Sequence, residues 1–168
     1  MTSSPLMPAG TIATRIWPYA ARSIERLITV AFDELDKAGR AWRPDTPDAN
    51  SVLTLVNHMI SNAEDNLLGT VVGANVTYDR QADFDTPETD PAAIRARWSR
   101  VRAAFEVTLP RLDDAHMFAG VTHPRRGTVT RFDVLVVVTR HAAEHLAHAE
   151  LTRDLYRARA ADRDRTAR

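Results

Sequence analysis

Three histidines share one face of a predicted helix near the C-terminal end of the sequence. His141, His145 and His148 are spaced four and three residues apart. At about 100° per residue they fall within a wedge of roughly 60° on a helical wheel. Val134, Val137, Val138 and Leu155 lie in or beside the same wedge. The spacing therefore predicts that the three imidazoles continue a stripe that faces the core.

Imidazoles on such a stripe predict a metal site. A buried imidazole needs a partner for each ring nitrogen, and three close imidazoles repel one another when protonated. A metal ion removes both costs because it binds neutral nitrogens. The alternative is a set of hydrogen-bonded or half-exposed histidines on an Ala-rich helix. The shared position of the three histidines in the wedge favours metal binding over this alternative, with His141 and His145 as ligands. His148 could be a third ligand, could hydrogen-bond to a ligand, or could face a substrate cavity.

The same residues also match the inverted zinc-protease motif H-x-x-E-H, in which Glu144 would be the catalytic base. That motif requires a further ligand well downstream, and Glu150 is the only glutamate after His145. The protease interpretation therefore fits poorly, although Glu144 stays a candidate catalytic residue.

A third ligand must come from elsewhere, because catalytic zinc sites use three protein ligands and keep one position open. The remaining histidines are His58, His116 and His123. His58 stands in the middle of a predicted helix, which would hold it firmly. However, the helical wheel places it nearly opposite the apolar stripe of that helix, so an exposed histidine on a polar face is the competing interpretation. His116 and His123, in a predicted loop, remain alternatives.

Helical periodicity predicts the elements that position these residues. Gly39 is expected to stop the first helix, Asn50 to cap the second, and Asp90 with Pro91 to start the third. Strand signals are weak. The sequence therefore predicts an all-α four-helix bundle with moderately long inter-helix connections. The expected helices cover about 16–38, 51–72 and 91–109, and a last one runs from Thr128 or Thr130 to about Ala158.

Composition narrows the possible partners and location. The 22 Lys and Arg balance the 22 Asp and Glu, so the sequence lacks the positive charge on which most nucleic-acid binders depend. The longest apolar run is too short to cross a bilayer, so no membrane association and a cytoplasmic location are expected. The organisation is expected to be a flexible N-terminus (1–13), one domain (14–158) and a charged, frayed C-terminal tail (159–168).

Three stretches, in order, resemble the DinB/YfiT-like superfamily of metal-binding four-helix bundles. ANSVLTLVNHM (49–59) is similar to the second-helix motif that ends on a ligand histidine. YDRQADF (78–84) resembles the Arg- and Phe-containing segment that often follows, and HAAEHLAHAELTRDL (141–155) resembles the last-helix pattern. The resemblance extends over about 14–158.

This resemblance implies His58, His141 and His145 as the metal triad. Some relatives, including the metal-binding domain of mycothiol-dependent maleylpyruvate isomerase, have Glu at the position of His141. That isomerase also has an additional C-terminal domain, which the present sequence lacks, so its particular reaction is not transferred. Zinc or nickel suits an all-histidine set best.

The resemblance also implies chemistry with a low-molecular-weight thiol. The chain has no cysteine, so any thiol must come from outside the protein. The leading hypothesis is a metal-dependent thiol transferase or isomerase that activates a mycothiol- or bacillithiol-like cofactor toward an electrophile. His148 would then move a proton and Arg80 would bind a carboxylate. The alternatives are a non-catalytic protein whose metal stabilises the bundle or a homodimer interface, and a metal-dependent hydrolase.

Overall fold

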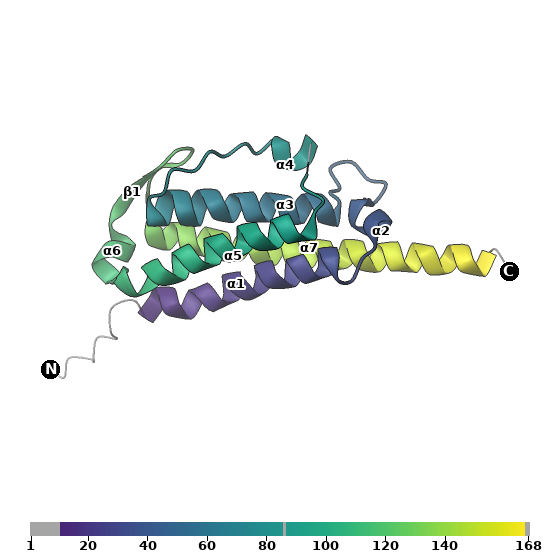
Figure 1. Cartoon of the computed structure of the whole chain (residues 1–168), viewed down its shortest axis with the longest axis horizontal. Coiled ribbons are helices and arrows are strands. Elements are labelled where there is room, and N and C mark those ends of the chain that lie inside the picture. Colours follow the sequence, from purple (N-terminus) through teal and green to yellow (C-terminus); the bar gives the residue numbers. More distant parts are fainter. Residues whose placement is uncertain (1–10, 86, 167–168) are drawn as a thin grey trace.

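A bundle of four long helices forms the protein in the computed structural model, which describes residues 11–85 and 87–166 (Figure 1). These helices are α1 (Thr11–Phe32), α3 (Val52–Ala63) with its continuation η1 (Glu64–Val72), α5 (Pro91–Thr108) and α7 (Arg131–Thr166). The short elements are α2 (Lys37–Ala41), α4 (Ala82–Asp85), η2 (Leu109–Arg111), α6 (Asp114–Phe118), β1 (Gly120–His123) and β2 (Gly127–Thr130). The predicted bundle is confirmed.

Side-chain caps explain where the helices begin. Asp90 accepts a hydrogen bond from the Ala92 N–H at 3.0 Å, with Pro91 in the first turn, as expected. Ser51 caps α3 by accepting from the Thr54 N–H at 3.1 Å, so the expected cap at Asn50 is wrong by one residue. Thr130 and Asp133 exchange backbone-to-side-chain hydrogen bonds at the start of α7, in the manner of a capping box.

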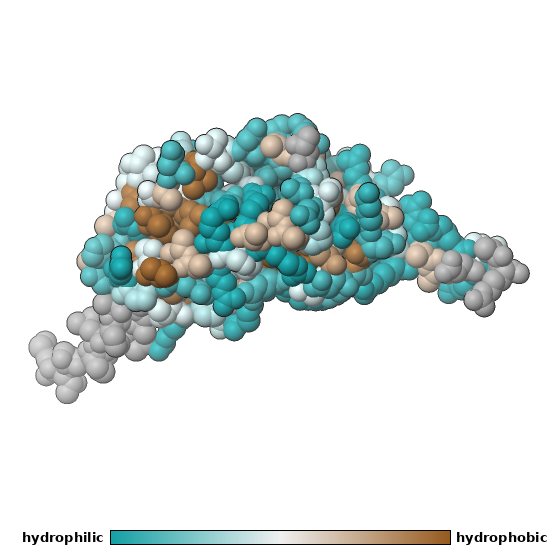
Figure 2. Space-filling view, viewed as in Figure 1, coloured by the Kyte–Doolittle hydropathy of each residue, from teal (hydrophilic) through white to brown (hydrophobic). Residues whose placement is uncertain are grey.

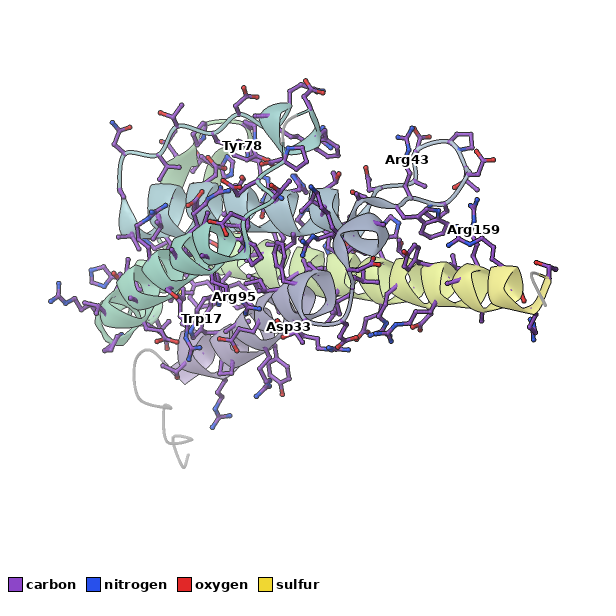
Figure 3. The ribbon with its side chains drawn as sticks, turned by 45° about the vertical axis from the view of Figure 1, so that its right-hand side comes forward. Trp17, Asp33, Arg43, Tyr78, Arg95 and Arg159 are labelled. Atoms are coloured by element: carbon purple, nitrogen blue, oxygen red, sulfur yellow. The ribbon has the colours of Figure 1, made fainter. Side chains whose placement is uncertain are left out.

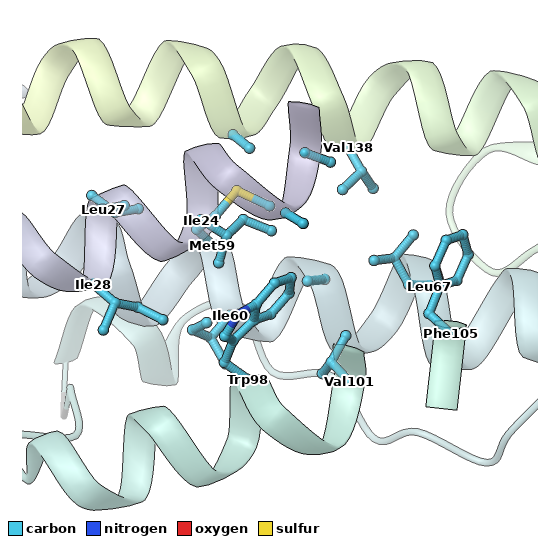
Figure 4. Packing of buried hydrophobic residues seen from close by; sticks show 14 of the residues in the cluster. Ile24, Leu27, Ile28, Met59, Ile60, Leu67, Trp98, Val101, Phe105 and Val138 are labelled. Atoms are coloured by element: carbon cyan, nitrogen blue, oxygen red, sulfur yellow. The ribbon is translucent and has the colours of Figure 1, made fainter. Parts of the chain in front are cut away.

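The predicted apolar stripes meet in one core (Figure 4). Ile24 and Leu27 of α1, Ile60 of α3 and Phe105 of α5 are all at most 1% exposed. The Phe105 ring lies 4.6 Å from that of Trp17, which ties α5 to α1. Burial of these stripes is the main stabilisation of the bundle.

The first helix is shorter than predicted. It ends at Phe32 instead of about 38, and Asp36 then starts the separate helix α2 by accepting from the Gly39 N–H at 2.6 Å. Gly39 therefore lies inside α2 and does not stop a helix. A Cβ at Gly39 would come within 2.7 Å of the Tyr156 ring, so glycine permits the close approach of α7.

A β-hairpin replaces part of the predicted loop before the last helix. Strands β1 and β2 pair antiparallel, with Gly120 opposite Thr130 and His123 opposite Gly127. Gly127 has a φ of 73°, which suits the tight turn. In β1, the Nε2 of His123 lies 3.2 Å from the Asn66 Oδ1 of η1. The hairpin therefore covers one end of α3–η1.

Helix α7 is longer than predicted. It continues to Thr166, whereas the sequence suggests an end near 158 and a frayed tail. Ion pairs one turn apart, such as Arg165 with Asp162, accompany this extension. The far end of α7 projects beyond the other helices in Figure 1. Of the predicted flexible N-terminus, residues 1–10 lie outside the described residues, and α1 begins at Thr11.

The surface is mainly polar, and ion pairs link the helices across it. In Figure 2 the apolar surface gathers toward the end that carries the hairpin and α6, where Phe118 is 50% exposed. Figure 3 shows Arg95 of α5 beside Asp33 at the end of α1, and these side chains form an ion pair at 2.8 Å. Within the described residues, no helix combines the length and apolarity that a bilayer crossing requires.

Candidate metal centre

Three imidazole nitrogens from two helices converge at one point between α3 and α7. The Nε2 atom of His141 lies 3.2 Å from that of His58 and 3.1 Å from that of His145. All three side chains offer a ligand atom within 4.8 Å of the others. The structure therefore brings together the three histidines that the sequence resemblance predicts.

The proton positions in this cluster leave one of its short contacts without a linear hydrogen bond. The Nδ1 of His58 lies 3.3 Å from the Oδ2 of Asp83. A carboxylate can only accept a hydrogen bond, so the proton of this pair is on the Nδ1 of His58. The Nε2 of His58 then presents a lone pair. Both short contacts share the Nε2 of His141, which in a neutral ring is either donor or acceptor. At most one of the two contacts is a linear hydrogen bond, so the other nitrogen pair lacks one.

A metal ion fits this geometry. Nitrogen ligands bond zinc at about 2.0–2.1 Å, which separates them by about 2.9 Å at octahedral angles and about 3.4 Å at tetrahedral angles. The separations of 3.1 and 3.2 Å fall inside that interval. The three side chains could therefore hold a divalent ion with only small movements.

His58 is buried, although the helical wheel places it on the polar face of its helix. Its residue is 7% exposed, and every residue of α3 except Thr54 is buried. The polar face of α3 is covered because the connection from η1 to α5 runs back along it (Figure 1). Asn57 holds this connection in place: its side-chain amide exchanges two hydrogen bonds with the backbone of Glu88. The interpretation of His58 as an exposed histidine is therefore wrong.

Asp83 of α4 completes the surroundings of His58, and sequence reasoning missed it. The carboxylate is 6% exposed, accepts from the Nδ1 of His58 and accepts from the Ser61 hydroxyl at 2.6 Å. A carboxylate on the second nitrogen of a metal-binding histidine fixes the tautomer and the ring orientation. The sequence feature that could have indicated this role is the position of Asp83 in the stretch YDRQADF, directly before Phe84.

We expect Asp83→Asn to weaken metal binding about 10–100-fold without unfolding the protein. The amide still accepts a hydrogen bond, but it loses the charge that holds His58 in its metal-binding tautomer. Zinc competition against a chromophoric chelator measures the effect. Asp85→Asn is the matched control, because Asp85 is exposed and its carboxylate accepts from the Gln81 side chain, away from His58. Equal affinity in Asp83→Asn and the wild type would contradict this role.

The histidines of α7 lie at the edge of its buried stripe. The buried positions are Val134, Leu135, Val138, Ala142, Ala149 and Thr152, whereas His141, His145 and His148 are only partly buried. The prediction that the imidazoles continue the core-facing stripe is therefore wrong in detail. Their position at the edge leaves His141 and His145 partly exposed.

Burial favours the neutral forms of His141 and His145. It lowers the pKa of His145 to about 3, helped by His141, His58, His148 and Arg80. Burial is also the main cause of the lowered pKa of His141, followed by the charge of His58. Neutral imidazoles are the form that binds metal, so protons compete weakly with the ion near neutral pH.

The lowered pKa of His145 predicts acid sensitivity of the metal-free fold. The unfolded chain takes up this proton near pH 6.5, whereas the folded chain takes it up only near pH 3. The free energy of unfolding should therefore be constant for this group above pH 6.5 and fall as the pH drops from 6.5 to 3. Urea unfolding of chelator-treated protein at several pH values measures it. His145→Gln should flatten the curve, and an unchanged slope in that variant would contradict the prediction.

The other candidate residues surround the cluster at different distances. His148 is one turn beyond His145 on α7 and is close enough to contribute to the lowered pKa of His145. Arg80 stacks on the Phe84 ring at 4.7 Å, and that ring lies 5.5 Å from the His58 ring. Glu144 is half exposed, pairs with Arg140 and lies 3.8 Å from the Nδ1 of His141, on the side away from the converging nitrogens.

Neither remaining histidine replaces His58. His116 of α6 is exposed and bonds Asp113 through its Nδ1 at 2.6 Å. His123 of β1 is buried with both ring nitrogens in use: Nδ1 accepts from the Arg125 N–H, and Nε2 lies 3.2 Å from the Asn66 Oδ1. Both alternatives for the third ligand are therefore excluded by their own hydrogen bonds and positions.

Comparisons with known proteins agree with this fold. A crystal structure titled a conserved protein from Enterococcus faecalis is similar, with a TM-score of 0.61 and 14% identity over 91% of this chain and 99% of that one. At this identity the likeness concerns the fold alone. A search of curated proteins finds no match. The family profile described as DinB superfamily matches residues 20–149, which include all three converging histidines. The chain belongs to the DinB superfamily.

Proposed function

We propose that the chain binds a divalent metal ion, zinc or nickel, through His58, His141 and His145 and uses it as a thiol-dependent transferase or isomerase. The observation that supports this most is the convergence of three Nε2 atoms, in which at most one of the two short contacts can be a linear hydrogen bond. A divalent ion held only by neutral imidazoles keeps its full charge and stabilises a thiolate at neutral pH.

The thiol is external in this proposal. The sequence contains no cysteine, so no side chain competes for the metal or for the electrophile. A low-molecular-weight thiol of the mycothiol or bacillithiol class would supply sulfur. Its sulfur forms the new bond to an electrophilic carbon, and in a transfer reaction the leaving group departs from that carbon.

The residues around the cluster then have distinct roles. His148, partly buried one turn from His145, accepts the thiol proton. Arg80, held over the Phe84 ring, binds an anionic group of the thiol or of its partner; within residues 11–85 and 87–166 it forms no ion pair that would neutralise it. Glu144 orients His141 from its Nδ1 side, instead of acting as a base on substrate.

Thiol consumption tests the proposal. Zinc- or nickel-loaded protein is incubated with mycothiol or bacillithiol and a haloarene or epoxide, and loss of thiol is followed together with halide release or ring opening. We expect turnover that disappears after chelation and in His145→Ala.

Arg80→Gln should raise KM for carboxylate-bearing electrophiles about tenfold and change kcat little. Arg43→Gln is the matched control, since Arg43 lies in the connection after α2.

The outcomes separate this proposal from its rivals. Stoichiometric metal without thiol-dependent turnover would support a non-catalytic, metal-stabilised bundle or dimer. Metal-dependent cleavage of an ester or amide without added thiol would support a hydrolase. Turnover that persists in metal-free protein would overturn the proposal.

A further inference from the structure

A chain of hydrogen bonds links helix α5 to the three-histidine cluster. Arg97 Nη2 donates to Glu64 at 2.6 Å and to the Ser61 hydroxyl at 2.9 Å. The Ser61 hydroxyl donates to Asp83 Oδ1 at 2.6 Å, and Asp83 Oδ2 lies 3.3 Å from the His58 Nδ1. The chain thus joins a surface helix to a predicted metal ligand through two buried side chains.

The direction of each hydrogen bond in this chain is determined. A guanidinium only donates, so the oxygen of Ser61 must accept from Arg97. The single hydroxyl proton of Ser61 is then free for Asp83, whose two oxygens receive one donor each. Ser61, Asp83 and His58 are 8%, 6% and 7% exposed, so water competes little for these bonds.

Glu64 forms ion pairs with two arginines, Arg97 and Arg100, so Arg100 can serve as a control for Arg97. Its carboxylate, 13% exposed, pairs with Arg97 and with Arg100, both at 2.6 Å. Of the two arginines only Arg97 also contacts Ser61. The two side chains therefore share the ion pair and differ in their contact with the chain that leads to His58.

We propose that Ser61 and Arg97 are positioning residues for the metal centre: by holding the Asp83 carboxylate from the side opposite His58, they keep the Nε2 lone pair of His58 aimed at the ion. This inference rests on the proposed metal binding. It makes an arginine of α5, which touches none of the three ligand histidines, a determinant of metal affinity.

Metal affinity in matched variants tests the proposal. Zinc binding is measured by chelator competition for Ser61→Ala, Arg97→Gln and Arg100→Gln, and urea unfolding of each metal-free protein is measured in parallel. We expect affinity about tenfold weaker in Ser61→Ala and Arg97→Gln and unchanged in Arg100→Gln. Ser61→Thr, which keeps the hydroxyl, should restore wild-type affinity. Equal losses in Arg97→Gln and Arg100→Gln, or wild-type affinity in Ser61→Ala, would overturn the proposal.

A second measurement separates failure of this inference from failure of the proposed function. Nitrogen-15 NMR of the metal-free protein reports which ring nitrogen of His58 carries the proton. We expect Nδ1–H in the wild type and in Arg100→Gln, with a growing Nε2–H population in Ser61→Ala and Arg97→Gln. Identical tautomers in all four proteins would overturn the positioning role even if zinc binds. A wild-type protein that binds neither zinc nor nickel would instead overturn the proposed function.

Discussion

Replacing His141 by alanine should lower the affinity for zinc or nickel by at least about a thousandfold. Its Nε2 is the central one of the three, in contact with those of both His58 and His145. Loss of one of three ligands removes a large share of a binding free energy that reaches about 10–16 kcal/mol in structural zinc sites, and 1.4 kcal/mol corresponds to tenfold in affinity. His58→Ala should have the same effect from the α3 side.

Metal content by elemental analysis and the metal-induced rise in melting temperature measure this loss. Wild-type protein should melt at higher temperature with added metal, because the ion binds only the folded chain, and both variants should lose that shift. His116→Ala is the matched control: its side chain is 61% exposed and bonds only within α6 and its cap. Stoichiometric metal in His58→Ala would show that the cluster is not the binding site.

Periodicity predicted the four long helices because their stripes are regular. Positions such as Ile94, Trp98 and Phe105 recur at helical spacing, and all are buried in the structure. The hairpin was not predictable in this way, since β1 and β2 have only four residues each and β2 shows no alternation of buried and exposed positions. Their pairing depends on docking against η1, which is a tertiary contact.

In the candidate site, too, helical spacing predicted some residues, whereas others depend on contacts between segments distant in sequence. His141 and His145 follow from spacing on one helix, whereas His58 required the family resemblance because its own helix suggests a polar face. That face is covered by a connection remote in sequence, held by the bonds of Asn57 to Glu88. Asp83 was missed for the same reason: its contact with His58 exists only after α4 folds back over α3.

The wider helix η1 is a further feature that periodicity does not reveal. From Glu64 to Val72 the turns are of the π type, which is rare and often found near functional sites. The widened turns bring Asp65 to Arg125, at 2.7 Å, and Asn66 to His123 of the hairpin. Helix α3 thus directs His58 toward α7, and its continuation holds the hairpin.

The largest expected change in stability is that of Phe105→Ala. Phe105 is 1% exposed and its ring lies 4.6 Å from that of Trp17, so truncation leaves a cavity between α5 and α1. Phenylalanine-to-alanine changes in cores cost about 3–5 kcal/mol. Urea unfolding of metal-free protein should show a loss in this range with an unchanged m-value.

Phe118→Ala is the matched control for this prediction. Phe118 is 50% exposed at the end of α6, and its ring contacts Phe132 at 5.2 Å between centroids. The same truncation should cost about 1 kcal/mol or less there, because about half of the side chain is already in water. Because Phe105 touches none of the ligand histidines, zinc affinity per folded molecule should stay at the wild-type value in both variants. A loss in Phe105→Ala no larger than that in Phe118→Ala would contradict the assignment of Phe105 to the centre of the core.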